Sequence, residues 1–534
     1  IESLFNYLEQ KEIVGLNGEL SYHAELNVPN QGEAYPKLTV FSDLKGVSFD
    51  GPAPFKKPSV EARNLALSLL IGSDQMNLNV NLKSEDSPYI ESKLLFAGDE
   101  LTSGEVLIGG AKSKKMNVNG INVVANIESV ELQSWVEFIQ NNIEELGSSE
   151  SDILHRVDLD FGVLNAYGQN FKKTKAIISK PKDYWQLDLK GESIQGKINF
   201  PSEETVLDIQ LDHIYLESES LGKSDNDGLS PAADTKDAEM LDPRQLPEIT
   251  FATKKLVKDK VNYGAWKTHV LPYDHGTVFK GITGNINGAA FGGQLNWKFD
   301  EYVEGEKAHT SILTMDIKGE KFEELTKAIG KDPLVSSEQF DASVSLVWPG
   351  SPPDFELAKV SGSILLKMEN GFLNTEDAKT GVLRVFGILN AESIMRRLKL
   401  DFSDLYKSGV GYDVFSVKTT INSGLLSFSE PLVIDGPSSS YLINGSVDLR
   451  KETLDMDMLV KLPVVQNLPL AALILGAPQI GGAVWLVDKL LGEPLSAITT
   501  ARYDITGSWE KPNVKLNKAM NASKKDRSKQ KSRR

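Results

Sequence analysis

Few residues of the sequence are spaced for reaction chemistry. Tyr273-Asp274-His275-Gly276, close to His269, could supply a general acid and a general base, although Asp-His-Gly between strands more often forms a turn. The chain has no cysteine, and its 6 histidines show none of the spacings that bind zinc. We therefore expect no catalytic residue, no metal site and no cofactor, and the sequence does not predict an enzyme.

Three other patterns resemble ligand sites only in part. The segment 225–228 starts like a calcium loop but has no glutamate at the twelfth position. Gly281, Gly284 and Gly288, in the strand-rich segment 280–297, lack the strand-to-helix setting of a phosphate loop and are expected to form turns or close strand contacts. The basic cluster at 396–399 could meet a phosphate head group or form a solvated helix end.

The charge distribution argues against a nucleic-acid partner. The 58 Lys and Arg against 74 Asp and Glu give a net charge of −16, which repels phosphate backbones. The segment 217–242 has acidic residues and almost no apolar pattern, so we expect a flexible linker there. The segment 517–534 ends in a basic run and is expected to be a disordered tail, which could touch anionic head groups or stay solvated.

Alternation of apolar and polar residues predicts a chain made mainly of β-strands. In the segment 75–83, for example, every second residue is apolar and the residues between are mostly asparagine. The same alternation recurs at 207–212, 340–348 and 454–462. Asn-Gly pairs at 119–120, 370–371 and 444–445 favour tight hairpin turns, so we expect an antiparallel meander.

Helices are predicted to be few. Apolar residues at helical spacing predict amphipathic helices at about 130–147, with Ser129 as the N-cap, at about 320–330 and at about 380–399. The segment 462–487 carries no formal charge, but its prolines would break one straight helix, so two short apolar helices are expected within 462–495. These helices would either contact a membrane or cap the end of the sheet.

So few helices cannot cover so many apolar strand faces. The pattern allows two architectures, because both require the same alternation. One is a row of β-sandwiches, in which the faces cover each other. The other is one continuous curved sheet whose apolar face is covered by the acyl chains of lipids.

Several segments of the sequence resemble the YhdP proteins, of the AsmA-like group in Gram-negative envelopes. The most specific lie at 384–390 (RVFGILN), 396–405 (RRLKLDFSDL), 428–437 and 503–509 (YDITGSW), with earlier matches at 42–57 and 242–247. The resemblance implies an elongated, curved antiparallel β-sheet that forms a hydrophobic groove. It also implies a bridge-like protein of the periplasm that carries phospholipids between the inner and outer membranes. An AsmA-like scaffold for outer-membrane biogenesis is the alternative, and a carbohydrate-active β-enzyme is a third.

The chain begins at Ile1 and has no leading apolar segment, so we expect it to be part of a longer parent anchored in the inner membrane, with its C-terminal end near the outer membrane. Envelope protein partners are not predicted. The expected segments are 1–216 and 243–461 as groove, 217–242 as linker, 462–495 as apolar helices, 496–516 as closing strands and 517–534 as tail.

The expected lipid-binding residues are the apolar members of four alternating strands. They are Met76, Leu78, Val80, Leu82, Leu207, Ile209, Leu211, Phe340, Val344, Leu346, Met456, Met458 and Val460. The expected membrane-contacting residues are Leu470, Leu473, Ile474, Val484, Trp485 and Leu486.

Overall fold

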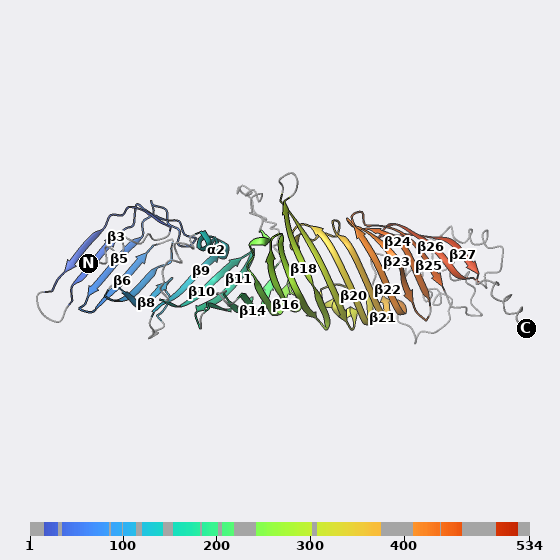
Figure 1. The fold of residues 1–534 in the computed structure, drawn as a ribbon, viewed down its shortest axis with the longest axis horizontal. Coiled ribbons are helices and arrows are strands. Elements are labelled where there is room, and N and C mark those ends of the chain that lie inside the picture. The colour runs from blue at the N-terminus through green and yellow to red at the C-terminus, as the bar shows by residue number, and fades with distance from the viewer. Residues whose placement is uncertain are drawn as a thin grey trace, which may run out of the picture. The chain divides into compact units, whose positions relative to one another are not determined.

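The chain forms two compact units built mainly from β-strands. The computed structural model describes residues 15–29, 35–84, 87–98, 100–113, 120–141, 153–181, 184–200, 206–217, 242–301, 307–374, 409–437, 439–461 and 498–521. Unit 1 comprises Ile1–Pro231 and Ile249–Lys260, and unit 2 comprises Ala232–Glu248 and Val261–Arg534. Figure 1 shows the strands of each unit following one another in chain order.

Unit 1 contains one large sheet and a small two-stranded ribbon of β1 and β4. Its strands are β1 (Leu16–Gly18), β2 (His23–Asn27), β3 (Lys37–Ser42), β4 (Val47–Phe49), β5 (Asn64–Ile71), β6 (Gln75–Lys83), β7 (Ile90–Ala97), β8 (Glu100–Ile108), β9 (Gly120–Glu131), β10 (Leu154–Ala166), β11 (Gln169–Ser179), β12 (Gln186–Lys190), β13 (Ile194–Asn199), β14 (Leu207–Leu216) and β15 (Ile249–Lys258). From β2 onward each strand pairs with the next one along the chain, β4 excepted.

The sheet of unit 1 is mixed, which corrects the expectation of a purely antiparallel meander. The pairs β8–β9, β9–β10 and β14–β15 are parallel. A parallel pair requires a connection that crosses back to the edge where the first strand began. Helix α2 (Leu132–Asn141) belongs to the connection between β9 and β10, and the acidic segment 217–242 lies between β14 and β15.

In unit 2, every pairing between the described strands is antiparallel. Its strands are β16 (Val261–Tyr273), β17 (Gly276–Ile286), β18 (Ala289–Glu301), β19 (Lys307–Gly319), β20 (Val335–Pro349), β21 (Ser361–Asn374), β22 (Gly409–Asn422), β23 (Leu425–Asp435), β24 (Ser440–Asp448), β25 (Thr453–Lys461), β26 (Ile498–Ser508) and β27 (Asn513–Asn521). Helix α4 (Phe322–Ala328) and the one-turn helices η1 (Pro243–Gln245) and η2 (Pro352–Asp354) lie between or before these strands.

The prediction of a mainly β chain with few helices is confirmed. The helix expected at about 320–330 is α4, and the one expected at about 130–147 is α2. Its expected N-cap is wrong, because Ser129 lies in β9, which continues to Glu131. The pairings of each unit join its strands into one sheet beside the small β1–β4 ribbon, so they do not give the row of β-sandwiches.

Two predicted turns lie inside strands instead. Asn370 and Gly371 belong to β21, where Asn370 has a φ of 50° and is skipped by the pairing with β20 and β22. The register is the same on both sides of Asn370, so β21 continues through it without a bulge, in the left-handed conformation that asparagine tolerates. Asn444 and Gly445 belong to β24, and a Cβ on Gly445 would lie within contact distance of the backbone of β25. Glycine here allows close strand approach rather than a turn.

Several predicted segments lie outside the described residues. These are the helix at 380–399, the apolar helices at 462–495 with their membrane-contacting residues, most of the linker at 217–242 and most of the tail at 517–534. Within the described ranges, no helix has the length and apolar character needed to cross a membrane.

Candidate functional site: two half-buried apolar rows

An apolar row crosses the sheet of unit 1 from β2 to β15. Residues that face each other across a strand pair point to the same side of the sheet, so the register identifies the row directly. Its members in strand order are Ala24, Val40, Leu67, Val80, Ser92, Val106, Val123, Val157, Ile178, Leu187, Ile198, Ile209 and Phe251. From Val40 to Phe251 every member is half-buried except Ser92, which is buried and is the one polar member. We call this set the long row.

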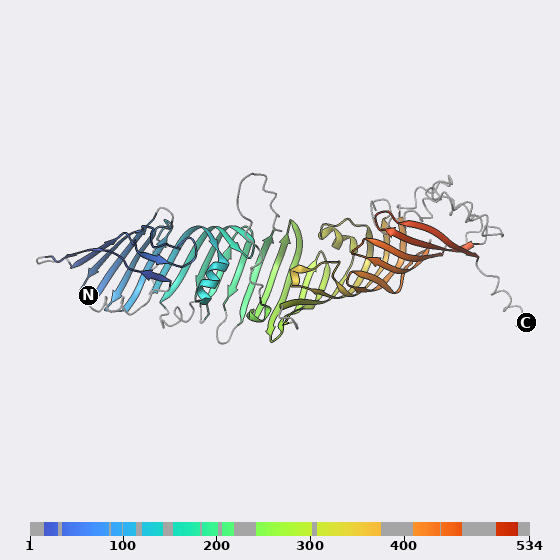
Figure 2. The same ribbon diagram turned by 90° about the horizontal axis from the view of Figure 1, so that it is seen from above.

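Helix α2 covers the part of the same face next to the long row. Its residues Leu132 and Trp135 pack on a buried cluster that includes Ala125, Phe161 and Leu189. Figure 2 shows α2 as the teal coil lying against the strands of unit 1. The helix therefore buries one side of the apolar face and leaves the long row beside it partly open.

The segment between β3 and β5, which includes β4, extends this cover. Phe55 contacts Trp135 edge to face at a centroid distance of 5.9 Å, and Phe49 contacts Phe138 in the same way at 6.2 Å. The segment is held by Lys57, which is buried and donates hydrogen bonds from Nζ to the carbonyl oxygens of Leu44, Val47 and Pro58. Burial lowers the pKa of Lys57, and the three carbonyl acceptors stabilise its buried ammonium group.

Unit 2 has a corresponding set, which we call the central row. Its members in strand order are Ile282, Gly293, Met315, Val344, Ile364, Thr419 and Phe428, from β17 to β23. All are half-buried except Thr419. The central row is therefore an apolar strip with partial access, like the long row.

Both ends of the strands beside the central row are covered. At one end, Phe322 and Leu325 of α4 cover Phe340, with ring centroids of Phe322 and Phe340 5.2 Å apart. At the other end, Trp297 is buried, and η1 lies against β16, β17 and β18. The accessible apolar surface is thus confined to the middle of the strands.

Beyond β23 the apolar face of unit 2 is closed. Met456, Met458 and Val460 of β25 are 0–4% exposed and pack in one cluster with Tyr441 and Tyr503 of the neighbouring strands. Burial raises the pKa of the Tyr503 hydroxyl to about 12. This cluster, which we call the closed core, has the character of an ordinary protein interior.

The predicted lipid-binding residues lie in three different environments. Val80, Ile209 and Val344 are in the two rows, and Met76, Leu78, Leu82 and Leu207 are half-buried on the same face. Leu211, Phe340 and Leu346 are buried beside the rows. Met456, Met458 and Val460 belong to the closed core, where lipid contact would require the core to open. Lipid contact itself stays a prediction for all of them.

Two of the patterns weighed for chemistry lie in a turn and in strands, whereas the segments 225–228 and 396–399 lie outside the described residues. Tyr273–Gly276 is the turn between β16 and β17, where Tyr273 donates a hydrogen bond to Asn296, and His269 lies 2.8 Å from Glu248. Gly281 sits in a bulge of β17, and Gly284 lies against the ring of Trp266. In the part of the chain that the structure describes, no three His, Asp or Glu residues are grouped to hold a metal ion.

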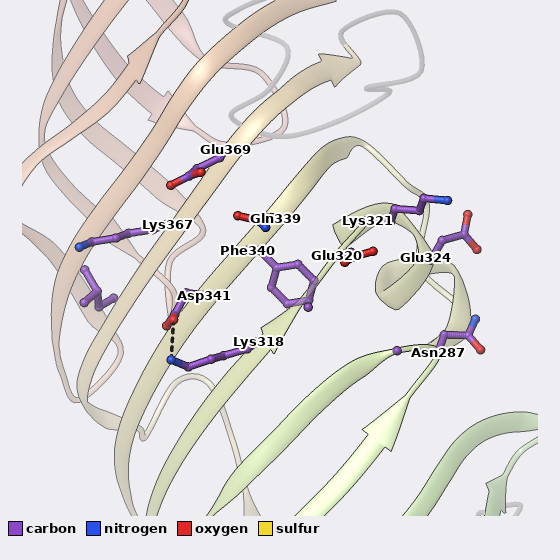
Figure 3. Close-up of a pocket in the computed structure, with 13 residues that line it drawn as sticks. Asn287, Lys318, Glu320, Lys321, Glu324, Gln339, Phe340, Asp341, Lys367 and Glu369 are labelled. Carbon is purple, nitrogen blue, oxygen red and sulfur yellow. Dashed lines mark ion pairs between the residues drawn. The ribbon is translucent and has the colours of Figure 1, made fainter.

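A hollow among the described residues of unit 2 is separate from both rows. It has a volume of about 810 Å³ and is lined mostly by charged side chains, including the ion pair of Lys318 and Asp341 at 3.0 Å. Figure 3 shows these groups with Lys367 and Glu369 around the strands, and Phe340 is its only predicted lipid-binding residue. A charged lining does not suit an acyl chain, so we give this hollow no role in lipid binding.

Sequence reasoning missed the rows as such. The apolar members were visible strand by strand, but their alignment depends on register, bulges and the three parallel pairs. The cover by α2 was also missed, because nothing in an amphipathic helix says which face of a sheet it covers.

The fold defines a class of protein: a β-sheet protein whose candidate site, among the described residues, is a surface of aliphatic side chains instead of a cluster of reactive groups. The chain belongs to the YhdP family, whose model, described as "YhdP protein", matches residues 1–514. It is similar to the protein named "Intermembrane phospholipid transporter YhdP" of Escherichia coli (strain K12), with 22% identity over 508 residues. The match covers 93% of this chain and 39% of that relative, so the chain spans about two fifths of the relative's length.

Proposed function

We propose that this chain carries phospholipids between membranes, with acyl chains held along the long row and the central row. The observation that carries the proposal is the long row, which runs through thirteen paired strands with Ser92 as its one polar member. A half-buried aliphatic surface of that length gains stability when acyl chains cover it, by about 0.8 kcal/mol per buried CH₂ group. The name of the relative, an intermembrane phospholipid transporter, supports the same cargo.

The role is transport and not catalysis. Aliphatic side chains bind without directional contacts and provide no acid, base or nucleophile. We place the chain in the periplasm as part of a longer protein that is anchored in the inner membrane and reaches toward the outer membrane. Its partners would be the phospholipids and the two membranes.

Photo-crosslinking along one strand tests the proposal. A benzophenone amino acid replaces Val80 in the long row or, as the matched control, Asn79, which is on the opposite face of β6. The chain is incubated with phospholipid vesicles and irradiated. We expect phospholipid adducts at position 80 and about tenfold fewer at position 79, because only the first faces the apolar surface.

Mass spectrometry of extracted lipids accompanies the crosslinking. Phospholipid recovered with the chain and linked at position 80 would support transport. Equal labelling at both positions, or no bound phospholipid, would contradict the proposal that the long row binds lipid. Either result would favour the scaffold alternative.

A further inference from the structure

A buried histidine at the covered end of β18 and β19 is not used by the proposed function. His309 is 6% exposed, and its Nδ1 atom accepts a hydrogen bond of 2.9 Å from Nε1 of Trp297. An indole N–H can only donate, so Nδ1 carries no proton and the neutral ring carries its hydrogen on Nε2. This Nε2 atom is buried and has no hydrogen-bond partner in the structure.

A segment from another part of the chain closes over this pair. The ring of Phe299 lies beside His309 with centroids 4.6 Å apart, and the guanidinium carbon of Arg244 lies 4.8 Å from the centroid of Phe299. Arg244 belongs to η1, and Asp242 caps η1 by accepting hydrogen bonds from the backbone and guanidinium of Arg244. The stack therefore joins η1 to β18 and β19.

The charged groups around His309 come from the two one-turn helices. Asp242 and Arg244 face it from η1, and Asp354 faces it from η2. The side chains beside it on the same face of β18 are the aromatic rings of Trp297 and Phe299, and the nearby turn before β17 contains His275. Burial lowers the pKa of His309 and outweighs the two carboxylates, which raise it.

We propose that His309, Trp297 and η1 form a proton-sensitive clasp, which is closed while His309 is neutral and opens when His309 is protonated. Protonation adds a hydrogen to Nδ1, so the imidazolium N–H would point at the indole N–H of Trp297, and two donors cannot share that contact. One ring has to move, and the moved imidazolium can then pair with Asp242 or Asp354.

Opening would change the apolar face of unit 2. Trp297 is two residues from Leu295 on the same face of β18, beside the central row. Displacing the Trp297 ring and η1 would uncover this end of the strands and widen the accessible strip. The clasp is a property of the protein without lipid, so it can be tested whether or not lipid transport is established.

Indole NMR and trypsin cleavage test the clasp on the whole chain. The 7 tryptophans are labelled with ¹⁵N, and the Trp297 signal is assigned by its loss in Trp297→Phe. From about pH 7.5 to about pH 5 we expect the Trp297 N–H signal to move with a midpoint below the ordinary histidine value of about 6.5. Cleavage after Arg244 should rise by up to about tenfold per pH unit as the pH falls toward that midpoint and level off below it, because it follows the open population.

Two matched variants decide whether His309 is the sensor. In His309→Gln the side chain stays neutral and its amide oxygen can still accept from Trp297, so both acid responses should disappear. In His269→Gln, which removes the exposed histidine beside Glu248, both responses should remain. A Trp297 signal that does not move with pH in the wild-type chain overturns the clasp, even if His309→Gln fails to fold. A response that survives in His309→Gln, or is lost in His269→Gln, also overturns it.

Discussion

Strands β6 and β25 have the same alternating pattern and opposite environments. In β6, Met76, Leu78, Val80 and Leu82 are all half-buried. In β25, Leu454, Met456, Met458 and Val460 are all buried, and Met458 is 0% exposed. Both strands lie within a sheet and are paired on both sides, so strand pairing does not cause the difference.

The side chains gathered over the apolar face make the difference. The neighbours of β25 carry Tyr441, Ile443, Tyr503 and Ile505 on the same face, and these large residues fill the space over Met458. The neighbours of Val80 in β6 are Leu67 and Ser92, which leave the row partly open. Alternation thus tells which side of a strand is apolar, but the neighbours decide whether protein or another molecule covers it.

An aspartate placed in β6 or in β25 gives the largest expected difference in unfolding free energy between the two strands. Met458→Asp would bury a charge without a partner and should cost more than about 4 kcal/mol of unfolding free energy, or prevent folding of unit 2. Val80→Asp can keep its charge in water and should cost only about 1 kcal/mol while abolishing lipid crosslinking along the long row. Urea unfolding, followed by hydrogen exchange in each unit separately, measures the loss of unfolding free energy in both variants. Equal costs would remove the distinction between open row and closed core.

Truncation of one methionine in each strand sharpens the same comparison. Met458→Ala leaves a cavity in the closed core and should cost about 2–5 kcal/mol, whereas Met76→Ala removes a half-buried side chain and should cost about 1 kcal/mol or less. Thermal unfolding of the two variants measures the difference. A larger loss for Met76→Ala would show that β6 is in a closed interior.

Alkaline titration probes the closed core through Tyr503. Its pKa is about 12 in the folded chain against about 10 when unfolded, so the folded state keeps its proton to higher pH. The associated stability is complete below about pH 10 and is lost as pH rises toward 12, a loss of about 3 kcal/mol by linkage. Unfolding measured against pH should show this loss in the wild-type chain and a smaller one in Tyr503→Phe. An unchanged slope in Tyr503→Phe would assign the loss to other groups.

The sequence was sufficient for the strands and insufficient for their arrangement. The alternation at 75–83 predicted both ends of β6 correctly, because period-2 alternation is a local property of a strand. The Asn-Gly pairs at 370–371 and 444–445 misled, because a left-handed asparagine, as at Asn370, and a glycine at a close strand contact, as at Gly445, also occur inside strands. The parallel pairing of β9 with β10 depends on residues far away in the chain. So does the difference between Met458, which is buried, and Val80, which is half-buried.

The composition of the long row bears on how cargo would move along it. Strands lie about 4.8 Å apart, and a lipid that shifts by one strand exchanges one apolar contact for another, except at Ser92 of β7. We expect such a surface to bind an acyl chain about equally well along most of its length, so the cargo would undergo one-dimensional diffusion. Net flow would then follow the difference in chemical potential between the two ends, and the direction of travel would be set outside the row.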